Sequence, residues 1–253
     1  MKTSTISRAF QKISAKIFRK RVADFKTIKK LFIGKSGLEV GGPSRIFKHK
    51  GLLPLYKIVK ELDGCNFSND TIWEGRLKNG SKYNFHPFKK GIQYISEASD
   101  LSHLPSSKYD FVISSNCLEH VANPLKAIAE WLRVVKVDGL LLIAVPNKEY
   151  CFDHNRPTTL FNHLLSDFQN NIQEDDLTHL ESILSLHDLD MDPQAGTPEQ
   201  FKARSLKNFE NRALHQHVFD IPLLTEIFNH FQVEILKTYT GKDFIILGKK
   251  KAI

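Results

Sequence analysis

Apolar and polar positions follow two different periods along most of this chain, and the change of period separates strands from helices. Continuous apolar runs predict strands at 38–40, 53–59 with a turn at 61–64, 93–95, 109–114 and 140–145. Apolar residues three and four positions apart predict helices over 125–135 and 221–231. Runs at 233–240 and 243–247 resemble a terminal β-hairpin. Continuous apolar strands separated by helices are typical of a parallel sheet covered on both faces.

This alternation stops over residues 147–216. The segment is polar, contains three prolines and is rich in histidine. We predict that it forms an insertion of two or three helices after the fifth strand.

Charge divides the chain into two parts. Residues 1–35 carry eleven Lys or Arg and one acid, so of the net charge of +8 they account for +10 and residues 36–253 for −2. We expect a basic arm over 1–35 and one domain over 36–253. Because the excess of positive charge lies outside the domain, binding of nucleic acid by the domain is disfavoured.

The arm also has apolar residues at helical spacing, which leaves three interpretations open. The first is a helix packed over the active site. The second is a helix that contacts a membrane surface or an acidic partner through residues 1–30, and the third is a cleaved transit peptide. The chain has no apolar run long enough for a transmembrane helix. Three scattered cysteines argue against a disulfide framework or a cysteine zinc site, so we expect a cytoplasmic location.

The segment 38–43 reads LEVGGP, which places a strand, an acid and a glycine turn in the order that a nucleotide-like cofactor requires. Glycine lets the backbone come close to a ligand, and Pro43 is expected to open the following helix. Asp63 lies 22 residues beyond Gly41, which is a common spacing for an acid that binds ribose hydroxyls.

Two further segments carry a resemblance to a family. Residues 109–121 read YDFVISSNCLEHV, a proline turn follows, and residues 132–139 read LRVVKVDG. With LEVGGP, they resemble the class I S-adenosylmethionine-dependent methyltransferases of small molecules, and more specifically methyltransferase-like proteins of polysaccharide biosynthesis. The resemblance implies a Rossmann-like, doubly wound, mostly parallel seven-stranded sheet that ends in the antiparallel hairpin.

The family's cofactor roles carry over by position. Glu39, Gly41 and Gly42 would face the methionine part of S-adenosylmethionine, and Asp63 would bind its ribose. Asn116 would line the sulfonium side. The adenine would be read by Glu97 with the Ala98 backbone, or by Asp100. Pro43 and Arg45 stand where the family has its later glycines.

Methyl transfer to a hydroxyl needs a base, and histidine is the natural candidate near neutral pH. His154 follows the fifth strand closely and is expected to be the general base, with Arg156, His215 and His217 orienting the acceptor. His120 is an alternative base.

We assign no metal ligands from the sequence. His179 and His187 are eight residues apart on an expected helix, too far to share one ion. Residues 188–199 imitate a calcium loop, but Pro193 stands where that loop requires glycine. A divalent ion held by residues from separate segments stays open.

The sequence therefore predicts an S-adenosylmethionine-dependent O-methyltransferase. The expected acceptor is a sugar or another polar hydroxyl of a cell-surface glycan pathway. The alternatives are a methyltransferase of nucleic acid or protein, and a non-catalytic cofactor-binding module of a membrane-associated assembly. The oligomeric state does not follow from the sequence.

Overall fold

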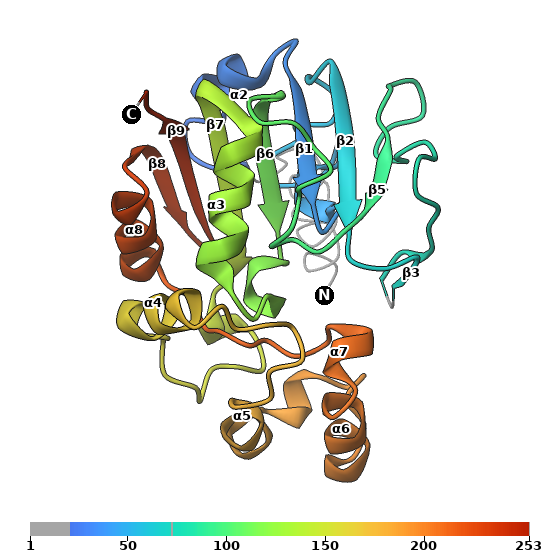
Figure 1. The fold of residues 1–253 in the computed structure, drawn as a ribbon, viewed down its shortest axis with the longest axis vertical. Helices are drawn as coiled ribbons and strands as arrows, with labels where there is room; N and C mark the ends of the chain where they lie inside the picture. The colour runs from blue at the N-terminus through green and yellow to red at the C-terminus, as the bar shows by residue number, and fades with distance from the viewer. Residues whose placement is uncertain (1–20, 72, 253) are drawn as a thin grey trace, which may run out of the picture.

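The computed structural model describes residues 21–71 and 73–252, and within them a seven-stranded sheet forms the centre of the molecule (Figure 1). The strands lie in the order β5-β2-β1-β6-β7-β9-β8. The first five in this order are parallel, and β9 runs antiparallel to both β7 and β8. The predicted Rossmann-like sheet with a terminal hairpin is confirmed. In chain order the strands are β1 (Ser36–Val40), β2 (Glu61–Asn66), β5 (Gln93–Ile95), β6 (Tyr109–Ser115), β7 (Val135–Pro146), β8 (Val233–Thr240) and β9 (Asp243–Lys250).

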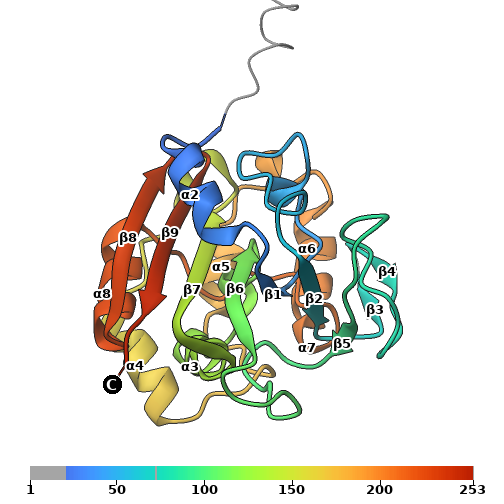
Figure 2. The same ribbon diagram turned by 90° about the horizontal axis from the view of Figure 1, so that it is seen from above.

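Helices cover the sheet and extend below it. One apolar core joins the sheet to α3 and α8, and a second core joins the opposite face to α2 and the segment after β1 (Figure 2). The helical insertion α4–α7 gathers beyond the carboxyl ends of the parallel strands (Figure 1). The helices are α2 (Phe25–Phe32), α3 (Pro124–Val134), α4 (Phe161–Gln169), α5 (Leu180–Leu186), α6 (Pro198–Ser205), α7 (Asn208–Asn211) and α8 (Ile221–His230).

Shorter elements complete the connections between them. They are the 3-10 helices η1 (Arg45–Phe47), η2 (Leu118–His120), η3 (Lys148–Tyr150) and η4 (Leu189–Met191), and the two-stranded ribbon β3 (Asp70–Thr71) and β4 (Gly75–Arg76).

The start of α3 shows how local sequence positions the site. The Asn123 side chain accepts the Lys126 N–H, and Pro124 occupies the first helical turn, where its missing N–H costs nothing. Trp131 on this helix is fully buried and donates its indole N–H to the Ala98 carbonyl. The helix therefore fixes the loop after β5, where the cofactor's adenine was expected.

The expected second strand is wrong in its position. Residues 53–59 are mostly buried but form no strand, and β2 begins only at Glu61, where a turn was predicted. Leu53 and Leu55 instead pack an irregular segment against the back of the sheet. A buried strand and a buried loop have the same apolar signature over a few residues, so the pattern did not separate them.

Pro43 also does not open an α-helix. The segment after it forms only the 3-10 helix η1 and then the irregular stretch that reaches β2. Leu53 N–H donates to the Ile46 carbonyl, which folds this stretch back on itself.

Part of the basic segment belongs to the folded body. Val22, Ile28 and Phe32 are buried in the second core, and the Phe32 ring meets the edge of Phe111 with ring centroids 5.1 Å apart. The expectations for residues 1–20 lie outside the described residues. No helix in the described part of the chain is long and apolar enough to cross a membrane.

Candidate cofactor and acceptor site

The glycine turn after β1 brings the backbone to the centre of the sheet edge. Gly41 has φ +82°, a conformation that suits glycine, and a Cβ there would stand 2.5 Å from the Cys117 Cβ. Its N–H donates to the Cys65 carbonyl at the end of β2. The turn is therefore held tightly between β2 and the loop after β6.

Glu39 does not face a cofactor, which corrects the sequence-based expectation. Its carboxylate is fully buried and accepts hydrogen bonds from the Ser44 N–H and hydroxyl and from the hydroxyls of Tyr56 and Tyr83. Burial raises its pKa, and these four donors oppose that rise. Gly42 fits against the same group, because a Cβ there would lie 2.3 Å from Glu39 Oε1. Both residues therefore shape the glycine turn from its buried side.

Asn66, rather than Asp63, stands at the end of β2. The register pairs Val40 with Cys65, so Asn66 lies beside the glycine turn. Its amide nitrogen donates to the Gly42 carbonyl at 2.9 Å, while its Oδ1 is buried and has no hydrogen-bond partner among the described residues. This orphaned acceptor is suited to a ribose hydroxyl.

Asp63, the expected ribose ligand, does not line the cavity at this edge of the sheet. Its carboxylate accepts from the Tyr109 hydroxyl at 2.7 Å, from Lys108 Nζ at 3.1 Å and from the Ile92 N–H at 2.9 Å. It lies three residues before Asn66, which is about 10 Å along a strand. The sequence favoured Asp63 because the predicted strand at 53–59 ends before it, whereas β2 ends at Asn66.

A first cavity at this edge joins most of the other expected cofactor residues. It is narrow, about 50 Å³, and is lined by Gly41, Asn66, Phe67, Glu97, Ala98, Asn116, His120, Glu174 and Arg212, among others. Asp100 does not line it, because its carboxylate turns to the Ser102 N–H. Glu97 is paired with Arg212 at 2.6 Å. The insertion therefore contributes a cation directly to the expected adenine position.

A second cavity of about 400 Å³ adjoins the first. The two share Gly41, Trp73, Asn116 and His120, and the second adds the polar side chains of Ser44, Arg45, Glu74, Ser115 and Asp243. These polar side chains and the shared wall make it the candidate acceptor cavity. Trp73 and Glu74 come from the loop after β2, which the sequence offered no motif to single out.

His120 stands in the wall that the two cavities share. Its Nδ1 lies 2.9 Å from the Leu214 carbonyl, so Nδ1 carries the proton and Nε2 keeps the lone pair. The Trp73 ring stacks on it at a centroid distance of 6.2 Å. Desolvation is the main cause that lowers the pKa of His120 to about 3, so the ring is neutral at physiological pH.

The expected base His154 lines neither cavity, which is a correction. Its Nε2 lies 2.7 Å from the Asp188 carboxylate at the start of η4. Its position just after β7 had suggested proximity to the sulfonium. The intervening η3 and the following turn carry the side chain towards the far part of the insertion instead.

Arg156 and His215 form a buried network below the two cavities. Arg156 pairs with Asp153 at 2.8 Å and donates to the carbonyls of His215 and Gln216. Asp153 also meets His215 Nδ1 at 2.5 Å. Neither Arg156 nor His215, which were expected to orient the acceptor, lines the candidate acceptor cavity. They hold the segment whose Leu214 carbonyl orients His120.

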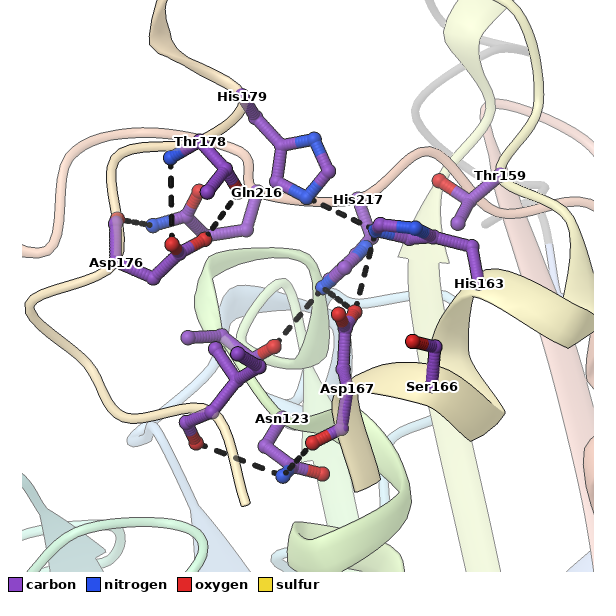
Figure 3. A network of polar contacts seen from close by, with 12 residues as sticks. Asn123, Thr159, His163, Ser166, Asp167, Asp176, Thr178, His179, Gln216 and His217 are labelled. Atoms are coloured by element: carbon purple, nitrogen blue, oxygen red, sulfur yellow. Dashed lines mark hydrogen bonds and ion pairs between the residues drawn. The ribbon is translucent and has the colours of Figure 1, made fainter. Parts of the chain in front are cut away.

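His217 is likewise absent from the acceptor cavity. It is buried and turns towards α4, where it lies beside His163, Asp167 and His179 (Figure 3). The spacing in the sequence gave no sign of this cluster, because its members come from three separate segments.

A parallel sheet with a reversed final hairpin, a glycine turn and an orphaned acceptor at the neighbouring strand end defines a protein that binds a nucleoside-containing cofactor. The comparisons with known proteins make this specific. Residues 50–143 match a family model described as a methyltransferase domain. These residues carry a methyltransferase domain, and the protein is an S-adenosylmethionine-dependent methyltransferase.

Solved structures agree at the level of the fold. An S-adenosylmethionine-dependent methyltransferase from Methanosarcina mazei is similar with a TM-score of 0.50 and 16% identity, covering 92% of this chain and 100% of that one. One from Mesorhizobium loti has a TM-score of 0.50 and 10% identity, covering 89% and 95%. No curated protein matches the chain.

Proposed function

We propose that the protein transfers the methyl group of S-adenosylmethionine to a hydroxyl of a sugar or a similarly polar acceptor. The observation that carries this proposal is the group of polar side chains in the cavity that shares its wall with the cofactor cavity. Ser44, Arg45 and Asp243 offer both donors and acceptors to a molecule rich in hydroxyls. An acceptor from a glycan pathway, as the sequence resemblance implies, fits this lining.

The cofactor residues suit S-adenosylmethionine. Asn66 Oδ1 would accept from the ribose, Gly41 allows close approach of the backbone, and Glu97 with the Ala98 N–H would meet the adenine. When bound, S-adenosylmethionine supplies an electrophilic methyl group on a positively charged sulfur. The residues of this chain hold the two molecules in line and exclude water from the gap between them.

His120 is the base that this geometry supports. His120 Nε2 would take the hydroxyl proton as the acceptor oxygen gains the methyl group from the sulfonium, which would leave S-adenosylhomocysteine as the second product. A low pKa suffices because the attacking oxygen becomes far more acidic while the new bond forms. Asp243 and Glu74 are also acids of the acceptor cavity, but neither lines the cofactor cavity.

The test measures release of S-adenosylhomocysteine with a panel of sugar nucleotides, oligosaccharides, phenols, peptides and RNA. We expect turnover with hydroxyl-rich acceptors and a methyl group on oxygen in the product. Turnover confined to RNA or protein, with a steep loss as salt rises, would favour the alternative of macromolecular methylation instead.

Membrane-surface contact through residues 1–30 is a separate proposal. Because Val22 and Ile28 are core residues, the informative truncation removes residues 1–20 alone. Co-sedimentation with anionic vesicles should be lost in that variant, and equal binding of both proteins would reject the contact.

A further inference from the structure

Four side chains of the insertion converge at a place that the cofactor and acceptor cavities do not include. His163 and Asp167 lie one turn apart on α4, His179 precedes α5, and His217 lies in the extended segment before α8 (Figure 3). One ligating atom from each lies within 4.8 Å of all the others. Residues up to 54 positions apart in the sequence therefore bring ligating atoms close to one another.

Hydrogen bonding alone leaves this cluster poorly satisfied. Asp167 Oδ2 lies 3.2 Å from His163 Nε2 and 3.8 Å from His217 Nε2, yet it is buried with no hydrogen-bond partner among the described residues. His217 Nδ1 is also buried and unpartnered, while its Nε2 lies 3.1 Å from the Ala122 carbonyl. An unpaired buried carboxylate oxygen costs free energy that a bound cation would recover.

The distances match the size of a small tetrahedral ion. Zinc bonds nitrogen and oxygen at about 2.0–2.1 Å, so ligating atoms around it stand about 3.3 Å apart. His163 Nε2 lies 3.0 Å from His179 Nε2 and 3.2 Å from Asp167 Oδ2, close to that separation.

We propose that His163, Asp167, His179 and His217 bind one Zn²⁺ ion. Three imidazoles with one carboxylate favour zinc over magnesium or calcium, which prefer oxygen ligands. Four protein ligands close the coordination sphere, which is typical of a structural site. The His163 side chain is 40% exposed, so the ion has a path from solvent.

The surrounding contacts show what such an ion would hold in place. Asn123, at the start of α3, donates to the Asp167 carbonyl at 2.9 Å. The loop between Asp167 and His179 carries Glu174, which lines the cofactor cavity and lies 3.6 Å from Arg212. An ion joining both ends of this loop would reduce its freedom and keep Glu174 beside the cofactor.

The experiment measures metal content in the full-length protein. After loading with zinc sulfate and exchange into metal-free buffer, we expect one zinc per chain by mass spectrometry of the metal. Replacement by Co²⁺ should give the strong visible absorption of a tetrahedral site. Chelation should lower the melting temperature, and added zinc should restore it.

Variants separate ligands from bystanders. His179→Ala and Asp167→Asn should lose at least tenfold in zinc affinity, while His230→Ala, an exposed histidine on α8 outside the cluster, should keep it. His163→Cys should retain zinc, because a thiolate can replace an imidazole as a zinc ligand. A thiolate does not replace the ring in packing, so retention of zinc would show that residue 163 acts as a ligand. His163→Ala, altered at the most exposed ligand, guards against variants that do not fold.

A folded wild-type protein that keeps no zinc after loading would overturn the proposal. Equal zinc content in the wild type, His163→Ala and His179→Ala would also overturn it, by showing adventitious binding elsewhere. Neither result depends on whether the acceptor is known.

Discussion

The assignment of Asn66, in place of Asp63, as the residue that binds the cofactor's ribose can be tested directly. Asn66→Ala removes the orphaned Oδ1 and also the donor that holds the Gly42 carbonyl. A hydrogen bond to a neutral acceptor contributes about 0.5–1.5 kcal/mol, and the loosened turn adds a cost of similar size. We therefore expect affinity for S-adenosylhomocysteine to fall by about 1–3 kcal/mol, which is about 5- to 160-fold.

Asp63→Ala is the matched control. Its carboxylate accepts from Tyr109, Lys108 and the Ile92 N–H, away from the cofactor cavity. We expect affinity within about twofold of the wild type, but a free energy of unfolding lower by about 1–3 kcal/mol, because the Tyr109 hydroxyl loses its acceptor. Calorimetric titration and urea unfolding measure the two quantities. A larger loss of affinity in Asp63→Ala than in Asn66→Ala would refute this placement of the ribose.

Three further predictions concern the base, the buried network and the adenine side of the cavity. His120→Ala should lower kcat by about 10²–10⁴ with little change in cofactor affinity, while His154→Ala stays near wild-type turnover. Burial raises the pKa of Asp153, but the paired His215 and Arg156 lower it to about 2. The ionised carboxylate therefore stabilises the folded protein by about 2 kcal/mol above pH 4, and this stabilisation is lost between about pH 4 and 2. Acid unfolding of Asp153→Asn should lack that decline. Arg212→Gln should change cofactor affinity measurably, and unchanged affinity would show that its ion pair with Glu97 lies apart from the adenine.

Much of the sheet could be predicted because its signal is local. The strands β5, β6, β8 and β9, and the helices α3 and α8, carry their own periodicity and caps. The strand β2 could not be placed in the same way, because the apolar run before it is equally buried. Register then decided the site: a strand moved by a few residues exchanges Asn66 for Asp63 at the sheet edge.

The candidate site was predicted only where strand ends define it. Gly41, Glu97, Ala98 and Asn116 follow strands of the sheet and meet in one cavity as expected. The histidines of the insertion did not follow this logic, because their positions depend on how four helices pack. Sequence distance from β7 suggested His154, yet the fold turns that side chain towards Asp188.

Residues 214–218 contact the loop after β6, where the Gln216 N–H donates to the Glu119 carbonyl, and two attachments within the insertion hold this segment in place. On one side Arg156 binds the carbonyls of His215 and Gln216, and on the other His217 joins the proposed zinc cluster. Immediately before these residues, the Leu214 carbonyl sets the tautomer of His120. Since a base must present its lone pair within about 3 Å of the hydroxyl, a small shift of this segment would impair proton transfer. Loss of either attachment should therefore lower turnover more than it lowers cofactor affinity, although neither touches the acceptor cavity.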